Sequence, residues 1–244
     1  MEWRQKVDRA SGGLLGALLP PRCLLCGADG VHGRDLCAGC LADLPVNTCC
    51  CARCALPLEH PAARCGICLK REPPFTAAWA PFRYAHPLDL LEARFKFHRD
   101  LAAGRLLANL MIEAAKEQLS GPMPGLLLCV PLHRDRLRER GYNQALELAR
   151  PLAKALDIPL DADALIRLRH TSAQTGLDAK ARRRNLHEAF AVRTDTQLPA
   201  HIAILDDVMT TGTTLRECAR VLLRTGVERI DVWALARAPA RGSQ

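Results

Sequence analysis

The chain has 244 residues, of which 49% are hydrophobic and 25% charged, so it can build a sizeable core as one large domain or two unequal ones. Its net charge of +8 favours an anionic partner such as nucleic acid or phosphates, or else a solvated basic surface. No apolar stretch is long enough to span a bilayer, and the short run at 14–19, interrupted by glycine and followed by two prolines, argues against a secretory signal. We therefore expect a cytoplasmic protein with no membrane partner.

Cysteines are concentrated near the N-terminus, where ten of the twelve fall between positions 23 and 68. Four Cys-x-x-Cys pairs begin at positions 23, 37, 51 and 65, a constant step of 14. In a cytoplasmic protein such clusters indicate metal more often than disulfides, and two pairs complete a closed tetrahedral zinc site. We therefore predict two structural zinc sites with the ligands Cys23, Cys26, Cys37, Cys40, Cys51, Cys54, Cys65 and Cys68.

The equal spacing of the pairs leaves alternatives open. A disulfide framework or a redox dithiol is the alternative to zinc, and the spacing does not fix which pairs share an ion. Sequential sharing, in which the first two pairs hold one ion and the last two the other, needs the shortest loops and is preferred. Cys49 and Cys50 fall outside the ladder and are interpreted as spare thiols.

The chain divides into an N-terminal segment (1–20), a Cys-rich zinc-binding module (21–72) and a larger domain (73–244). The larger domain begins with a strand-like stretch at 76–85, which Pro81 weakens. Apolar residues three and four apart then predict helix through 88–119.

A short apolar run at 126–132 suits a strand buried on both faces, and 141–156 is again helical. Pro151 should kink that helix or begin a second piece. The remaining pattern predicts strands at 164–169, 201–208 and 229–238, with helices at 177–189 and 213–226. Strands alternating with helices predict an α/β fold with a largely parallel sheet flanked by helices.

The stretch ILDDVMTTGTTL (204–215) places two acids where a strand ends and a Thr-rich turn enters a helix. Backbone N–H groups, hydroxyls and the helix dipole favour a phosphate there, while carboxylates accept hydrogen bonds from a diol. No lysine follows the glycine, which excludes the nucleoside-triphosphate P-loop. A ribose 5-phosphate fits both halves of the stretch; a strand followed by a plain helix N-cap is the alternative. The candidate ligands are Asp206, Asp207, Thr210, Thr211, Gly212, Thr213 and Thr214.

This stretch resembles the phosphoribosyl-pyrophosphate (PRPP) signature of type I phosphoribosyltransferases. Together with the Cys-x-x-Cys ladder, VPLHRDRLRERGYNQA (130–145) and RHTSAQTGLDAKARRRNLHEAF (169–190), it makes the chain similar to the ComF family, which includes competence protein ComFC and GntX-like members. The resemblance covers nearly the whole chain from Cys23 onward. It implies a double zinc-ribbon-like module on a type I phosphoribosyltransferase-like domain, with the ribose hydroxyls on Asp206 and Asp207 and the 5-phosphate in the Thr-rich turn.

The resemblance also implies where the rest of PRPP binds. Pyrophosphate with Mg²⁺ is expected near the loop after strand 126–132, and the passage at 169–190 takes the place of a lid that closes over the site. A solvated basic helix is the alternative for the arginines in both segments. The candidates are Pro131, Leu132, His133, Arg138, Arg140, Asn143, Gln174, Arg182 and Asn185.

Two functions follow as expectations. The first is a Mg²⁺-dependent, PRPP-binding phosphoribosyltransferase whose acceptor and general base the sequence does not identify, linked to DNA uptake in natural transformation. The second is a non-catalytic scaffold that uses or senses PRPP while binding single-stranded DNA or a competence protein. Deletion of residues 1–72 is expected to spare PRPP binding and to impair DNA or partner binding.

Overall fold

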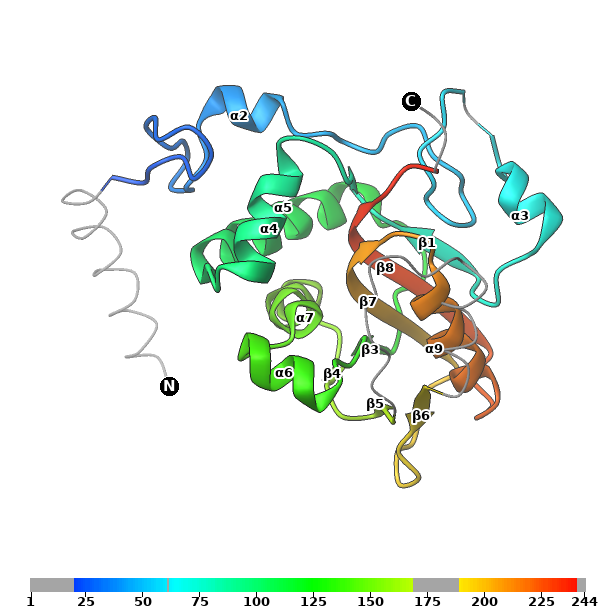
Figure 1. Ribbon diagram of the computed structural model, residues 1–244. Helices are drawn as coiled ribbons and strands as arrows, with labels where there is room; N and C mark the ends of the chain where they lie inside the picture. Colours follow the sequence, from blue (N-terminus) through cyan, green and yellow to red (C-terminus); the bar gives the residue numbers. More distant parts are fainter. Residues whose placement is uncertain (1–19, 61, 169–188, 241–244) are drawn as a thin grey trace.

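The computed structural model describes residues 20–60, 62–168 and 189–240. Two short helices belong to the cysteine segment, and the other elements alternate between strands and helices (Figure 1). In chain order they are α2 (Ala38–Ala42), α3 (Gly66–Lys70), β1 (Ala77–Trp79), β2 (Phe82–Arg83), α4 (Leu88–Phe97), α5 (Leu101–Gln118), β3 (Leu126–Cys129), α6 (Arg134–Arg140), α7 (Gln144–Leu156), β4 (Leu160–Asp161), β5 (Leu165–Arg167), β6 (Phe190–Val192), β7 (His201–Met209), α9 (Thr213–Leu223) and β8 (Arg229–Arg237).

The main sheet is parallel in every pairing and has the order β1-β8-β7-β3-β4, with β2 also pairing with β8. Its longest strands, β7 and β8, pair from His201 with Arg229 to Met209 with Arg237. The apolar runs in these strands are explained by burial on both faces, because helices cover each side of the sheet. The predicted α/β architecture with a largely parallel sheet is confirmed.

Helices form a layer on each side of the sheet. On one side α4, α5 and α7 pack together around Leu91, Leu107 and Leu148, which share a core with Leu205 of β7. On the other side α9 packs over the sheet, and its Leu222 shares a second core with residues of β7 and β8. Figure 1 shows this division, with α9 (orange) on the opposite side from the green helices.

The order of the strands creates a switch point between β3 and β7. From β3 the chain passes through α6 and α7 to β4 at one edge, whereas from β7 it passes through α9 to β8 in the other direction. Ligands of open α/β sheets bind at the carboxyl ends of strands at such a point. The loop after β3 and the turn after β7 therefore flank the expected binding crevice.

Several elements differ in detail from the sequence prediction. Pro81 divides the stretch 76–85 into β1 and β2, and the helical region 88–119 is two helices separated by a turn at 98–100. The alternative of a second helical piece at Pro151 is wrong, because α7 runs from Gln144 to Leu156 as one helix. The strand predicted at 164–169 exists, but it pairs antiparallel with β6 in a separate two-stranded sheet. The helix predicted at 177–189 falls almost entirely outside the described residues.

The cysteine segment packs into both cores. Cys23 and Leu36 belong to the core with α4 and α5, while Cys54 and Cys68 belong to the core with α9. An ion pair of 2.9 Å between the Arg34 guanidinium and the Glu113 carboxylate further joins the segment to α5. In the part of the chain that the structure describes, no helix has the length and hydropathy needed to cross a bilayer.

Candidate functional site

The eight ladder cysteines form two groups of four. Within each group the Sγ atoms all lie within 4.8 Å of one another, and the members are those of the preferred sequential pairing. The Cys26–Cys37 and Cys54–Cys65 Sγ distances are both 3.6 Å, close to the edge of about 3.8 Å in a tetrahedron with Zn–S bonds of about 2.3 Å. Both groups therefore fit a structural zinc ion, and Cys49 and Cys50 belong to neither.

Backbone N–H groups support thiolates in both groups. The Cys51 Sγ accepts a hydrogen bond from Cys65 N at 3.2 Å, and the Cys37 Sγ accepts one from Cys40 N at 3.4 Å. Burial opposes ionisation of Cys51, but N–H donors from Cys65, Cys54 and Arg53 lower the pKa of this thiol to about 7. Stabilised thiolates are the form that binds zinc.

Asp206 and Asp207 lie within β7, which continues to Met209 rather than ending at the acids. Asp206 Oδ1 accepts a hydrogen bond of 2.9 Å from the Asp207 backbone N–H. Burial, followed by the neighbouring Asp207 carboxylate, raises the pKa of Asp206 to about 8. The charge of Asp206 in turn acts on Arg167 of β5, and together with burial it raises the pKa of the Cys218 thiol in α9.

Asp207 makes a close ion pair that the sequence analysis missed. Its Oδ2 lies 2.8 Å from the Lys96 Nζ, which is also 2.6 Å from Oε1 of the buried Glu92 one helical turn earlier in α4. Although burial opposes the charge, the carboxylates of Asp207 and Glu92 raise the pKa of Lys96. The two acids thus have different surroundings, because Asp207 faces a cation while Asp206 is held in a site that favours its neutral form.

The turn between β7 and α9 has the features expected of an anion site. Gly212 adopts a left-handed conformation (φ 71°) as the N-cap residue of α9, and the Thr211 hydroxyl accepts a hydrogen bond of 3.4 Å from the Thr213 N–H. Thr210 and Thr211 are exposed, and the hydroxyls of Thr211 and Thr213 lie 2.8 Å apart. Thr214 is in the first turn of α9. N–H groups and hydroxyls therefore gather where the positive end of the helix dipole lies.

A buried arginine, also missed by the sequence analysis, holds this turn. Arg237 is 4% exposed, and its Nη1 donates to the carbonyl of Met209 at 2.8 Å and to that of Thr210. Its Nε donates to the carbonyl of the zinc-group residue Cys54 at 3.1 Å. One guanidinium thus connects the turn between β7 and α9 with the second cysteine group.

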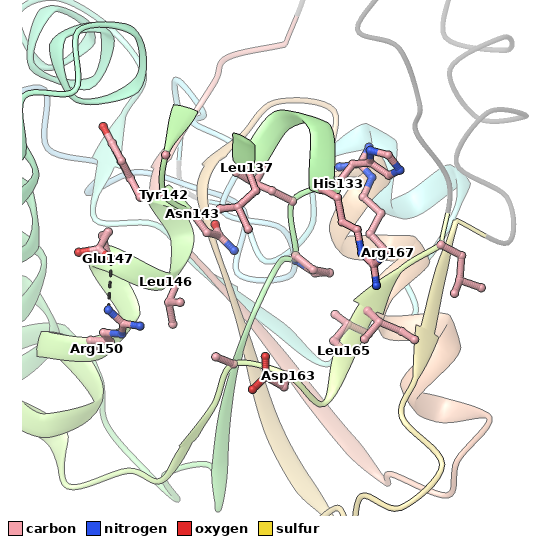
Figure 2. Close-up of a pocket in the computed structure, with 17 residues that line it drawn as sticks. His133, Leu137, Tyr142, Asn143, Leu146, Glu147, Arg150, Asp163, Leu165 and Arg167 are labelled. Atoms are coloured by element: carbon pink, nitrogen blue, oxygen red, sulfur yellow. Dashed lines mark hydrogen bonds and ion pairs between the residues drawn. The ribbon is translucent and has the colours of Figure 1, made fainter. Parts of the chain in front are cut away.

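A cavity of about 760 Å³ opens beside the loop that follows β3 (Figure 2). Figure 2 shows His133 and Arg167 on one side of it, Asn143 and Tyr142 on another, and Asp163 below. The expected pyrophosphate candidates that line it are Pro131, Leu132, His133 and Asn143. Asn143 also shapes the site, because its Nδ2 donates to the Val130 carbonyl at 3.0 Å and its Oδ1 caps α7.

The remaining candidates lie elsewhere. The Arg138 side chain is 81% exposed, and the Arg140 guanidinium is 5.7 Å from the centroid of the Phe97 ring; neither residue lines the cavity. The lid candidates Gln174, Arg182 and Asn185 lie outside the described residues.

Comparison with protein families matches both parts of the chain. Residues 14–69 match the double zinc ribbon domain, and residues 143–244 match the phosphoribosyl transferase domain. Competence protein F of Haemophilus influenzae is 39% identical over 226 residues, covering 89% of this chain and 97% of the relative. The DNA utilization protein YhgH of Salmonella typhi is 35% identical and covers 90% of this chain and 98% of the relative.

Solved structures with related folds are more distant. The glutamine PRPP amidotransferase of B. subtilis aligns with 55% of this chain and 26% of its own length, at 18% identity and a TM-score of 0.37. Adenine phosphoribosyltransferase of Thermoanaerobacter pseudethanolicus aligns with 57% of this chain and 82% of its own length, at 19% identity and a TM-score of 0.35. The domain match, the sheet order and the cysteine groups carry the fold assignment instead. The chain belongs to the competence protein F family, in which a double zinc ribbon precedes a phosphoribosyltransferase domain.

Proposed function

We propose that the protein binds PRPP together with Mg²⁺ in the crevice between the ends of β3 and β7. The observation that carries this proposal is the pairing of Asp206 and Asp207 with the Thr-rich N-terminus of α9. The 5-phosphate would bind Thr210–Thr214, and the ribose hydroxyls would bind the two carboxyl groups.

The different surroundings of the acids suit a vicinal diol. Asp206 keeps its proton up to a pKa of about 8 and can donate a hydrogen bond, whereas Asp207, whose Oδ2 lies 2.8 Å from the Lys96 Nζ, can accept one. Such a donor and acceptor pair can bind two neighbouring hydroxyls in one orientation. The site would therefore discriminate between a ribose and a sugar that lacks one of these hydroxyls.

Pyrophosphate and Mg²⁺ are assigned to the loop at 130–133 and the adjoining cavity. Arg134 and Arg167 bring positive charge to its wall, which suits a phosphorylated ligand. Mg²⁺ usually keeps several water ligands and binds substrate phosphates, so it needs no dedicated protein cage here. When bound, it would neutralise charge on the leaving pyrophosphate of a transfer reaction whose acceptor is not assigned.

Isothermal titration of Mg²⁺ and PRPP into the zinc-loaded protein tests the proposal. We expect saturable binding by the parent and none by the Asp206→Asn, Asp207→Asn double variant. The matched control is Asp195→Asn, which alters an exposed acid paired with the nearby Arg193 and should bind as the parent does. Absence of binding by a folded parent, or equal binding by the double variant, contradicts the proposal.

A second candidate function is the handling of single-stranded DNA during DNA uptake. The specific observation is α6, which carries four arginines against two acids and lies beside the crevice. The relatives named for competence and DNA utilization support this direction. Binding of a labelled oligonucleotide should weaken steeply with salt, because arginine–phosphate contacts release counterions. Binding that is absent at low salt contradicts this function.

A further inference from the structure

Phe97 is an exposed aromatic residue at the end of α4. It is 68% exposed, although aromatic residues form only 4% of the chain. The neighbouring residues His98 and Arg99 are also exposed. Leu90 on α4 and Leu101 at the start of α5 are exposed too, so this part of the surface presents both apolar and basic side chains.

The Phe97 ring is positioned by contacts with neighbouring side chains. The Arg140 guanidinium lies 5.7 Å from its centroid, and Arg140 Nη1 is itself fixed by a hydrogen bond of 2.9 Å to the buried Gln144. Nearby, Phe95 stacks on Tyr142 with centroids 5.3 Å apart, and the Tyr142 hydroxyl donates to the Phe95 carbonyl. These contacts join the end of α4 to the junction of α6 and α7.

The adjacent turn adds a positioned cation. Arg99 adopts a left-handed backbone conformation (φ 54°), and its Nη2 donates to the Glu139 carbonyl at 2.7 Å. The Arg138 side chain on the same helix as Glu139 is 81% exposed. A fixed aromatic ring with one arginine over it and others around it is the combination that binds stacked bases and phosphates.

Phe97 lies on an open surface, which suits some kinds of ligand better than others. Phe97 lines neither the cavity beside β3 nor the cavity of about 480 Å³ between α5 and α7. A small acceptor molecule needs most of its surface buried, which this open ring does not provide. A base within a single strand can stack on the ring while its neighbouring nucleotides and phosphates contact the surrounding surface. In a duplex the base faces are already covered by neighbouring base pairs. The surface therefore fits single-stranded nucleic acid.

We propose that Phe97 is a base-stacking position for single-stranded nucleic acid, with Arg99 and Arg138 contacting the backbone phosphates. The proposal rests on the second candidate function above and gives it a specific contact. The preceding residue, Lys96, binds Asp207 at 2.8 Å, so the end of α4 connects this surface with the acid pair.

The test is the affinity for a labelled oligothymidylate of about 15 nucleotides, measured by fluorescence anisotropy at low salt. We expect Phe97→Ala to weaken binding about 5- to 100-fold, and Phe97→Trp to retain it, since any aromatic face can stack. Leu90→Ala is the matched control, because Leu90 is also on α4 and is 47% exposed; it should bind as the parent does.

Two further measurements separate stacking from charge. An abasic oligonucleotide with the same backbone should bind the parent and Phe97→Ala equally. The slope of log affinity against log salt should be unchanged in Phe97→Ala and smaller by about 0.7 in Arg138→Gln, because Arg138, unlike Phe97, contacts a phosphate.

The outcomes distinguish this proposal from the function on which it rests. Tight binding by both the parent and Phe97→Ala overturns the stacking position alone. An equal loss on the abasic strand also overturns it, because the ring would then act through the fold. Absence of binding by the parent at low salt overturns the stacking position and the DNA-binding function together.

Discussion

At the scale of single residues, the acid pair combines two carboxyl groups in different surroundings, because Asp206 is in a site that favours its neutral form and Asp207 lies beside a cation. Lys96 and Glu92, the groups that make Asp207 different from Asp206, lie on a helix far away in the sequence. Motif reasoning found both acids from their position before the Thr-rich turn. It missed Lys96 because no local sequence pattern indicates an ion pair between residues that are far apart in the chain.

Asp206→Asn should make the protein more stable at alkaline pH. The native pKa of Asp206 is about 8, whereas an unfolded aspartate has a pKa of about 3.9. Between these values the native state holds a proton that the unfolded state has lost, so this group destabilises the fold increasingly as pH rises through that range. We expect the variant to gain at least about 1 kcal/mol of unfolding free energy at pH 8 and little at pH 4.

Urea denaturation at both pH values measures this difference. The control is Asp195→Asn, because Asp195 is exposed. Asp161 is unsuitable, because its Oδ1 accepts hydrogen bonds from the Asp163 and Ala164 N–H groups. A more stable Asp206→Asn that has lost PRPP binding would mark Asp206 as a residue kept for function. An Asp206→Asn variant no more stable than the parent at pH 8 contradicts the raised pKa.

Lys96→Met should strongly destabilise the fold, because it leaves the Glu92 carboxylate buried without its cation. Breaking a buried ion pair from one side costs about 3–5 kcal/mol. Adding Glu92→Gln should recover part of that loss, since the buried charge is then removed as well. A double-mutant cycle measured by denaturation checks this coupling, and additive effects of the two changes would contradict it.

At the scale of elements, the turn from β7 into α9 depends on one glycine. Gly212 has a left-handed φ of 71°, and a Cβ there would lie 2.6 Å from the Met209 Cε. Gly226 beyond the other end of α9 has φ 91° with nothing within 4 Å of a Cβ. The two glycines therefore share the backbone requirement, but only Gly212 lies in the proposed phosphate site.

Both Gly212→Ala and Gly226→Ala should destabilise the protein by about 1–2 kcal/mol, because a side chain disfavours the left-handed conformation. The Met209 side chain is flexible enough to move away from the new methyl group. Only Gly212→Ala should also weaken PRPP binding, which calorimetry on both variants measures. Equal PRPP affinity in the two variants would remove the turn from the binding site.

Long, periodic elements were predictable and short ones were not. The apolar runs of β7 and β8 and the helical periodicity of α5 and α9 specify their type locally. Strand β4 has only two residues, and its pairing with β3 defines it more than its composition does. Likewise, β5 has the composition of a strand, but nothing local assigns it to the antiparallel pair with β6.

At the scale of the whole molecule, the zinc module and the larger domain are coupled. Arg237 joins the Cys54 carbonyl to the carbonyls of Met209 and Thr210, and the second cysteine group lies in the core shared with α9. The cysteine ladder revealed the metal sites from spacing alone. The ladder gave no indication that the second cysteine group supports the turn between β7 and α9. Deletion of residues 1–72 should therefore impair PRPP binding, contrary to the expectation from sequence.

Arg237→Gln should reduce both stability and PRPP affinity, because buried carbonyls lose a charged donor. We expect a loss of about 2–3 kcal/mol in unfolding free energy. Arg193→Gln is the matched control, since its exposed ion pair with Asp195 should contribute less than about 1 kcal/mol. Zinc removal by a chelator should lower PRPP affinity in the parent, and unchanged affinity in the metal-free protein contradicts the coupling.

Amide hydrogen exchange with and without Mg²⁺ and PRPP tests the central claim most directly. The account predicts slower exchange at 209–215, where N–H groups of the turn and the first turn of α9 would bind the 5-phosphate, and around the loop at 130–133. The exposed loop at 120–123, at the opposite end of β3 from the loop at 130–133, should be unaffected. Unchanged exchange at 209–215 under saturating ligand, or protection confined to another region, would contradict a PRPP site on this turn.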